Sequence, residues 1–321
     1  MELSVVIATR DRARLLEGTL EHLARQQAPG IRWEVVVVDN GSSDDTPAVL
    51  ERAAARLPLV RLAEPRPGKN RALNRALEVA RGELLLFTDD DVIPDPRWVA
   101  EMVGAARRWP DAAVFGGRVE LAYPPGTPGW LRDPVHPALN FARFDFDRPE
   151  GPIELPPNGP NLALRRSALA GLRFREDIGP DGTRDYAMGS ETELLDRLRA
   201  RGATTIYVPG ALVHHVVQPA QLATRALLRR SFRLGRGQVR RAPKPARPVV
   251  RLFGIPRYLW RELATRGLRW ALNAPLGRRR RLGAGLELWN TLGQIAEHRS
   301  AARAAAGATA DRRRADGEAR A

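Results

Sequence analysis

The sequence contains no cysteine among its 321 residues. This absence excludes disulfide bonds, thiolate nucleophiles and metal sites built from cysteine. The sequence also has no apolar run of about 18 residues, so we expect no membrane-spanning helix. Its first residues lack the basic start and the long apolar core of a signal peptide. Together these absences favour a reducing compartment, and we expect the protein in the cytoplasm.

Acidic residues are scarce in the last third of the chain. Residues 219–321 hold 24 basic and 6 acidic side chains, whereas residues 1–218 hold 28 and 31. The net charge of +15 therefore belongs to the C-terminal segment and is not spread over the molecule. This distribution argues against a uniformly basic nucleic-acid-binding protein. The basic segment can meet phosphate-bearing lipid, nucleic acid or an acidic partner, and composition does not choose among them.

Apolar runs alternate with helical patterns through the first half of the chain. Strands that are nearly all apolar indicate a parallel sheet that helices cover on both faces. Ligands of such α/β sheets bind at the carboxyl ends of the strands. We expect strands at 3–8, 34–39, 59–62 and 84–88, and helices at 11–27, 44–56, 69–80 and 96–108.

Residues 122–160 contain ten prolines, with Trp130, Phe141 and Phe144 among them. Proline at this density prevents a continuous helix or strand. We therefore expect an ordered excursion, anchored by its aromatic side chains, that covers a site. A loose linker is the alternative.

Regular structure is expected again after residue 160, at 161–165, 190–201, 205–208 and 211–217. The region after residue 218 is helical in pattern and rich in arginine, and the chain ends in a stretch of mostly Ala, Arg, Asp and Gly. We expect three parts: an α/β domain over 1–218, with halves of about 1–118 and 119–218, a basic helical extension over 219–298, and a disordered tail over 299–321.

Three adjacent carboxylates, Asp89, Asp90 and Asp91, follow the strand expected at 84–88. They repel one another unless a cation or solvent neutralises them. Alternate residues of an extended segment point the same way, so Asp89 and Asp91 can face one site while Asp90 faces elsewhere. Two oxygen ligands at an open strand end suit Mg²⁺ or Mn²⁺, with substrate phosphate completing the shell. The alternative is a solvated acidic turn before the next helix.

Another carboxylate, Asp39, ends the strand expected at 34–39. At that place it can accept the ring N–H of a uracil, thymine or guanine base. An aspartate that opens a turn also often hydrogen-bonds its own backbone, and the polar string 40–46 allows that alternative.

Four segments now stand in a fixed order along the chain: SVVIATR at residues 4–10, VVVDNGSSD at 36–44, GKNRALN at 68–74 and LFTDDD at 86–91. This order resembles family 2 glycosyltransferases of the GT-A fold. The resemblance implies a mixed, mainly parallel sheet flanked by helices. It also implies an enzyme that transfers a sugar, with inversion, from a nucleotide-diphosphate donor to a hydroxyl acceptor, in bacterial polysaccharide, glycolipid or cell-envelope synthesis.

The resemblance assigns roles residue by residue. Asp91 matches the principal metal ligand, and Asp89 matches a residue near the ribose or the metal. Asn161 matches a residue that lines the donor sugar, in a Gly-x-Asn segment. The remaining donor-binding expectations are Thr9 and Arg10 in the first loop, Asp39 at the base, Arg71 and Asn74 from an Arg-x-x-Asn pattern, and Asp90 beside the metal ligands.

An inverting displacement needs a base for the acceptor hydroxyl. The resemblance places it at Glu191, where the family usually has Asp, at the start of the helix expected at 190–201. A helix N-terminus favours the ionised carboxylate. The alternative is that Ser190 and Glu193 form a capping box at this helix start, which leaves Glu191 free. Asp185 is the second candidate for the base.

Two histidines, His214 and His215, follow an apolar strand. Successive strand residues point to opposite faces, so at most one of them can join the metal site, and we favour His215. An ordinary strand-end pair is the alternative. Gly116 and Gly117 resemble the family's Gly-Gly strand, where they allow close approach of a sugar or of backbone, or else mark a bulge.

The basic extension combines arginine with Leu, Tyr and Trp at helical spacing. Such helices suit an anionic membrane surface, and we expect peripheral contact with the inner face of the plasma membrane. A helical subdomain that packs on the core is the alternative.

Other functions are weaker. A sugar-nucleotide pyrophosphorylase normally has a glycine-rich phosphate loop, which residues 8–12 lack. A nucleic-acid-binding protein would carry aromatic stacking residues on its sheet, and no nucleic-acid partner is expected. The residues do not choose among UDP-, GDP- and dTDP-linked donors, and the acceptor can be a lipid-linked saccharide.

Overall fold

The structure is a computed structural model that describes residues 1–132, 136–243 and 249–318. The chain forms two compact units. One, here called the sheet unit, comprises residues 1–128, 140–183 and 190–219. The other, here called the helical unit, comprises residues 129–139, 184–189 and the chain from residue 220 onward. Two short segments thus group with the C-terminal helices, which a single boundary at residue 218 did not foresee.

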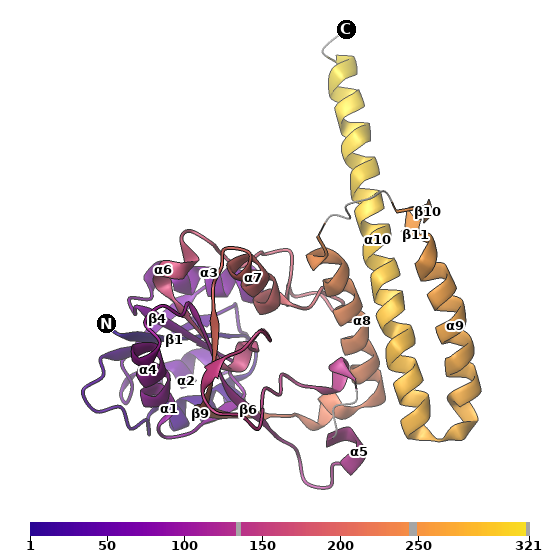
Figure 1. The fold of residues 1–321 in the computed structure, drawn as a ribbon. Coiled ribbons are helices and arrows are strands. Elements are labelled where there is room, and N and C mark those ends of the chain that lie inside the picture. Colours follow the sequence, from indigo (N-terminus) through magenta and orange to yellow (C-terminus); the bar gives the residue numbers. More distant parts are fainter. Residues whose placement is uncertain (133–135, 244–248, 319–321) are drawn as a thin grey trace. The chain divides into compact units, whose positions relative to one another are not determined.

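The sheet unit alternates strands and helices, as the apolar pattern predicted (Figure 1). Its strands are β1 (Leu3–Thr9), β2 (Trp33–Asp39), β3 (Leu59–Ala63), β4 (Leu84–Thr88), β5 (Val92–Pro94), β6 (Val114–Ala122), β7 (Gly151–Pro152), β8 (Leu162–Arg165) and β9 (Thr205–Val216). Its helices are α1 (Ala13–Leu23), α2 (Thr46–Ala54), α3 (Lys69–Val79), α4 (Trp98–Arg108), α6 (Arg166–Leu169) and α7 (Ser190–Arg199).

The strands form one mixed sheet in the order β3-β2-β1-β4-β8-β6-β9-β5, with β7 paired to β9. The first four strands are parallel, and β6 is parallel to β9. Strand β8 is antiparallel to both of its neighbours. The carboxyl ends of β1, β2 and β4 therefore lie at one edge, where Thr9, Asp39 and Asp89 follow or end their strands.

The core lies on both faces of the sheet. Alternate residues of β2 show this directly, because Val35 and Val37 pack with α1, α2 and α4, whereas Val36 and Val38 pack with α3 and α7. All four valines are fully buried. This two-sided burial explains why the strands are continuous apolar runs instead of alternating ones.

Strand β9 is continuous, where the sequence predicted two short strands at 205–208 and 211–217. Its pairing with β6 shifts register after Gly117, so residues 209–211 form an irregularity in the ladder. The sequence pattern broke at Pro209 and Gly210 because these residues occupy this irregularity. The outcome matches the bulge that was the alternative for Gly116 and Gly117.

The helical unit contains α5 (Gly129–Arg132), α8 (Thr224–Arg241), α9 (Arg257–Asn273) and α10 (Arg278–Glu318), with a hairpin of β10 (Arg251–Leu252) and β11 (Ile255–Pro256) before α9. Helix α10 lies between α8 and α9 (Figure 1). Gly235 and Gly293 allow α8 and α10 to approach closely, because a Cβ at either would lie 2.0 Å from a backbone oxygen of the other helix. No helix among the described residues is long and apolar enough to cross a bilayer.

Helix α10 overlaps the stretch for which the sequence predicted a disordered tail. The sequence predicted a disordered tail over 299–321, whereas α10 continues to Glu318, and residues 319–321 lie outside the described part. Alanine and arginine, which dominate this stretch, are among the strongest helix formers, so the low-complexity composition supports helix as readily as disorder.

Candidate active site

Two carboxylates and one imidazole gather at the carboxyl edge of the sheet. Asp89 and Asp91 follow β4, and His215 comes from β9, where it pairs in register with Val92 of β5. One ligand atom from each of Asp89, Asp91 and His215 lies within 4.8 Å of the others. Residues 124 positions apart in the chain thus meet because β5 pairs with β9. His214 points elsewhere, with its Nδ1 3.6 Å from Glu120.

His215 is held in the orientation that a metal ligand needs. Its Nδ1 donates to the carbonyl oxygen of Phe141 at 2.7 Å, and its Nε2 lies 3.3 Å from Asp91 Oδ1. A fixed Nδ1–H leaves the Nε2 lone pair of the neutral ring facing the carboxylates. Burial lowers the pKa of His215, but the hydrogen bond and the charge of Asp91 outweigh it and raise the pKa above its ordinary value.

Asp91 supplies the test of whether a cation fits. Its Oδ1 is buried, and within the described residues it accepts no well-formed hydrogen bond. Burial raises the pKa of Asp91, but His215 and Arg12 outweigh burial and lower it to about 2, so the carboxylate is ionised at neutral pH. Two carboxylates and an imidazole around an under-coordinated oxygen fit a divalent ion.

Asp90 and Thr9 are buried next to these three residues and hydrogen-bond each other. Thr9 Oγ1 donates to Asp90 Oδ2 at 2.7 Å, and both side chains are buried. Arg12 spans the two neighbouring carboxylates, 2.8 Å from Asp90 and 2.5 Å from Asp91. Burial raises the pKa of Asp90 to about 6, although Arg12 opposes the rise. Thr9 and Asp90, expected to bind donor, thus contact each other in this structure.

A lysine joins this group to the predicted base. Lys69 Nζ lies 2.8 Å from Asp89 Oδ1 and 3.0 Å from Glu191 Oε1. Burial lowers the pKa of Lys69, but these two carboxylates outweigh it and hold the pKa well above its ordinary value. Sequence reasoning assigned no role to Lys69 or Arg12. The signal was available, because a carboxylate triplet needs cations nearby.

Glu191 is separated from the other acids of its helix. Glu193 is occupied by Arg197 at 2.7 Å and Arg175 at 3.7 Å. Glu191 instead faces Lys69 beside Gly159, where a Cβ would lie 2.6 Å from Glu191 Oε1. Only glycine at position 159 leaves room for the Glu191 carboxylate in its present position. Asp185, the second candidate, belongs to the helical unit and lies 3.5 Å from Arg229.

Asp39 and Arg10 lie in the loops at the same edge of the sheet. Asp39 Oδ1 accepts a hydrogen bond from the backbone N–H of Ser42 at 2.9 Å. This is the bond to the local backbone that was the alternative to base binding. Arg10 lies 3.5 Å from Asp11 at the surface. The loops after β1 and β2 are joined, because the Asp11 carboxylate accepts from Ser43 at 2.7 Å.

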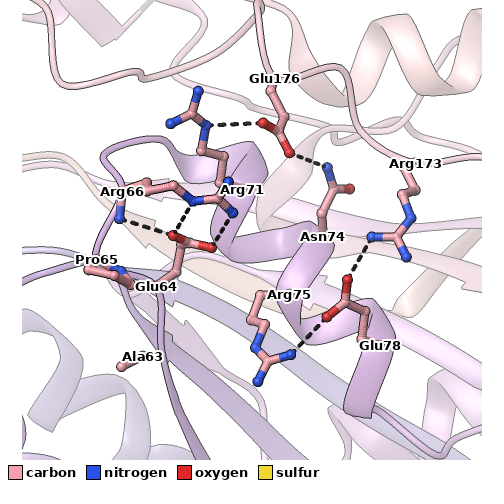
Figure 2. A pocket seen from close by; sticks show the side chains of 10 residues that line it. All are labelled: Ala63, Glu64, Pro65, Arg66, Arg71, Asn74, Arg75, Glu78, Arg173 and Glu176. Atoms are coloured by element: carbon pink, nitrogen blue, oxygen red, sulfur yellow. Dashed lines mark hydrogen bonds and ion pairs between the residues drawn. The ribbon is translucent and has the colours of Figure 1, made fainter.

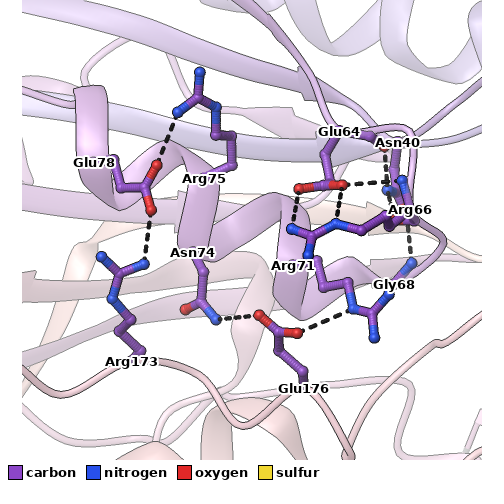
Figure 3. A network of polar contacts seen from close by, with 10 residues as sticks. All are labelled: Asn40, Glu64, Arg66, Gly68, Arg71, Asn74, Arg75, Glu78, Arg173 and Glu176. Atoms are coloured by element: carbon purple, nitrogen blue, oxygen red, sulfur yellow. Dashed lines mark hydrogen bonds and ion pairs between the residues drawn. The ribbon is translucent and has the colours of Figure 1, made fainter.

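Arg71 and Asn74 lie in a separate, charged groove of about 450 Å³ (Figure 2). Its ion pairs link Arg71 to Glu176, and Arg75 and Arg173 to Glu78. The residues that line it are Ala63, Glu64, Pro65, Arg66, Arg71, Asn74, Arg75, Glu78, Arg173 and Glu176. None of the metal-site residues, nor Glu191, is among them. Asn40 braces one rim by donating to the carbonyl oxygens of Glu64 and Arg66 (Figure 3).

Two residues that the sequence predicted to bind the donor hydrogen-bond the protein backbone in this structure. Asn161 is fully buried, and its amide donates to the carbonyls of Arg118 and Ala211 while its Oδ1 accepts from Trp98. Asn74 exchanges two 2.9 Å hydrogen bonds with the backbone of Phe174. Both amides satisfy buried backbone, and a sequence motif does not distinguish such a brace from a ligand contact.

Comparison with known proteins gives a consistent result. The family described as glycosyl transferase family 2 matches residues 4–172. The succinoglycan biosynthesis protein ExoM of Rhizobium meliloti is 28% identical over 79% of this chain and 80% of its own length. The N-acetylglucosaminyl-diphospho-decaprenol L-rhamnosyltransferase of Mycobacterium tuberculosis is 30% identical over 56% of this chain and 66% of its own length.

Solved structures share the fold. The mannosyltransferase PcManGT of Pyrobaculum calidifontis, in complex with GDP-Man and Mn²⁺, superposes with a TM-score of 0.53 at 22% identity, covering 99% of this chain and 79% of that one. TarS of S. aureus in complex with UDP-GlcNAc gives 0.54 at 15% identity, covering 94% and 92%. At these identities the likeness concerns the fold alone.

Proposed function

Because this chain belongs to glycosyltransferase family 2, we propose that it transfers a sugar from a nucleoside-diphosphate donor to an acceptor hydroxyl, with inversion, at the site formed by Asp89, Asp91, His215 and Glu191. The family resemblance drawn from the four sequence motifs is confirmed, and the chain is a glycosyltransferase of the GT-A type. The assignment of individual residues is the proposal.

One observation carries it: Lys69 contacts Asp89 and Glu191 together, so the predicted base lies one side chain away from the predicted metal ligands. An inverting transfer needs this proximity, because the acceptor oxygen must attack the sugar while the diphosphate leaves from the other face.

In this mechanism Glu191 accepts the proton of the attacking hydroxyl. Glu191 lies at the start of α7, beside Gly159 and within reach of Lys69. Lys69 orients Glu191 and adds positive charge near the leaving diphosphate. Arg12 fixes the direction of the Asp91 carboxylate.

A divalent ion, Mg²⁺ or Mn²⁺, would be held by Asp89, Asp91 and His215. When bound, it supplies Lewis-acid stabilisation of the charge that develops on the departing diphosphate. The remaining donor contacts that we propose are Asp39 at the base and Arg10 at the neighbouring loop, with Arg71 at the groove.

The acceptor is proposed to be a lipid-linked saccharide. The support is the relative whose name describes a diphospho-decaprenol acceptor, together with the basic helical unit. This places the enzyme, as we propose it, at an anionic membrane surface.

Thermal unfolding with UDP-, GDP- and dTDP-sugars, each with and without Mn²⁺, tests the proposal. One donor should raise the melting temperature only when Mn²⁺ is present. Asp91→Ala should abolish that dependence. Glu191→Gln should keep donor binding and lower kcat by about 10²–10⁴-fold. Failure of every donor to stabilise the protein, or full turnover by Glu191→Gln, would overturn the assignment.

A further inference from the structure

An exposed apolar stripe runs along the side of α9 that faces away from α10. Its leucines Leu268 and Leu272 are 62% and 63% exposed, Tyr258 is exposed near the start of the helix, and Leu276, in the 3₁₀ turn that follows the helix, is 53% exposed. The spacing of four residues places Leu268 and Leu272 on one face of α9, with Tyr258 on the same side ten residues earlier and Leu276 just beyond the helix end. Here this stripe is called the outer face of α9.

The inner face of the same helix is an ordinary core. Leu259 is buried with Ile255 and Ile295, and the rings of Trp270 and Trp289 meet edge to face at 6.0 Å. Helix α9 therefore already has its packing partner in α10, and the leucines of the outer face are not needed to attach it. Exposed leucines in a row are a contact surface for something outside the chain.

A tight hairpin with an exposed apolar tip precedes α9. Leu252 pairs with Ile255, so the turn consists of Phe253 and Gly254 alone, both with positive φ. Phe253 is 84% exposed at the tip. The left-handed backbone conformation is unfavourable for a bulky residue such as Phe253. Within the described residues, no packing of the Phe253 ring offsets this cost.

Arginines lie at both ends of the stripe without acidic partners. Among the described side chains of the helical unit, the acids Asp185, Glu262, Glu287 and Glu297 all pair with arginines elsewhere: Arg229, Arg266, Arg269, Arg236 and Arg240. Arg257 and Arg261 adjoin the hairpin, and Arg278, Arg279 and Arg280 follow Leu276, all of them exposed. The outer face is thus apolar along its middle and cationic at its ends.

We propose that the outer face of α9 and the Phe253 tip dock on a lipid bilayer surface that carries anionic head groups. The apolar side chains would enter the boundary between head groups and acyl chains, while the arginines stay at the level of the phosphates. Charge complementarity selects this occupant. A second copy of the chain would bring arginine against arginine, and a nucleic acid offers phosphates but no apolar layer for three leucines and a phenylalanine.

This inference rests on the membrane location given under the proposed function. Flotation of the purified protein with lipid vesicles tests it and needs neither donor nor acceptor, so its outcome is separate from that of the sugar-transfer assignment. The protein should float with vesicles of phosphatidylcholine and phosphatidylglycerol, and far less with phosphatidylcholine alone or at high salt. Phe253→Gln combined with Leu268→Gln and Leu272→Gln should weaken binding by at least about tenfold. The control is Leu155→Gln, which changes an exposed leucine of the sheet unit.

A second experiment tests whether binding depends on where the arginines lie or only on the total positive charge. Arg257→Gln, Arg261→Gln and Arg279→Gln together should weaken binding by at least about tenfold, whereas Arg56→Gln, Arg61→Gln and Arg201→Gln, which remove the same charge from the sheet unit, should not. Melting temperatures near that of the wild type would show that each variant folds. The proposal would be overturned if the wild type did not float, or if the two arginine triple variants floated equally well. Dimerisation that depends on Leu268 and Leu272 would also overturn it.

Discussion

Single residues of the site depend on positive charges that hold carboxylates in place. Lys69 joins Asp89 to Glu191, and Arg12 neutralises the neighbouring pair. The carboxylates could be predicted from the sequence because they directly follow apolar strands. The carboxylate triplet signals that cations lie nearby, but the sequence does not identify Lys69 and Arg12 as those cations, because each lies on a different element from its partners and only tertiary folding brings them together.

Removing the charge of Lys69 should expose this dependence. In Lys69→Met, Asp89 and Glu191 would face each other without a cation, so we expect a loss of about 2 kcal/mol in unfolding free energy. Mn²⁺ should then raise the melting temperature more than in the wild type, because it replaces part of the lost charge. Thermal unfolding with and without Mn²⁺ measures both effects. Lys69→Arg keeps the charge and serves as the control, and an unchanged Mn²⁺ response in Lys69→Met would contradict the argument.

Gly159 gives a test that leaves the base chemically intact. In Gly159→Ala the new Cβ would lie 2.6 Å from Glu191 Oε1, so the carboxylate has to move. We expect kcat to fall by about 10–100-fold with little change in melting temperature, because a displaced base misaligns the proton transfer. Gly151→Ala is the control, since its Cβ would meet nothing within 4 Å. Equal kcat values for the two variants would show that the position of Glu191 does not matter.

Among the elements, the register shift between β6 and β9 determines which groups Asn161 hydrogen-bonds. The sequence predicted a ligand contact, and the structure shows a buried brace that donates to the carbonyls of Arg118 and Ala211, freed where the ladder is irregular. A bulge is set by the pairing of distant strands, so a local motif carries no signal of it.

Asn161→Ala should therefore cost stability. Two buried carbonyls and the Trp98 indole would lose their partner, for an expected loss of about 3 kcal/mol in unfolding free energy. Asn158→Ala is the control, because Asn158 also donates to two carbonyls, those of Ala142 and Arg143, but nearer the surface. Urea unfolding of both variants measures the difference. If Asn161→Ala lost no more unfolding free energy than Asn158→Ala, Asn161 would not have the stabilising role argued here.

A second brace ties β2 to the connection before β4. Buried Glu34 accepts from Ser4 Oγ at 2.7 Å and from the backbone and guanidinium of Arg81. Burial raises the pKa of Glu34, but these hydrogen bonds outweigh burial and lower the pKa below its ordinary value. A carboxylate with a depressed pKa in the fold stabilises it above the unfolded pKa, and this stabilisation is lost as the pH falls through the folded value.

Glu34→Gln should accordingly lower the unfolding free energy by about 2 kcal/mol at neutral pH and lose less on acidification than the wild type does. Unfolding curves between about pH 7 and pH 3 measure this difference. The exposed Glu51→Gln should follow the wild type throughout. A constant gap between Glu34→Gln and the wild type at every pH would contradict the linkage.

For the whole molecule, the fold of the first half could be predicted because each strand is a continuous apolar run and the helices between them have the required spacing. The division into two units could not be, because residues 129–139 and 184–189 join the helical unit through contacts far apart in the sequence. At the end of the chain, composition weighs charge and complexity but not the helix propensity of alanine, so it predicted disorder where the structure has the end of α10.

The hydrogen bond from His215 to the carbonyl of Phe141 has one more consequence. Phe141 belongs to the proline-rich excursion, so this stretch and the ion-binding cluster share an atom contact. If the cluster holds a cation, as we propose, a molecule that moves the Phe141 carbonyl also changes the affinity of the cluster for that cation. Reciprocity then requires the cation to change the affinity for that molecule by the same factor.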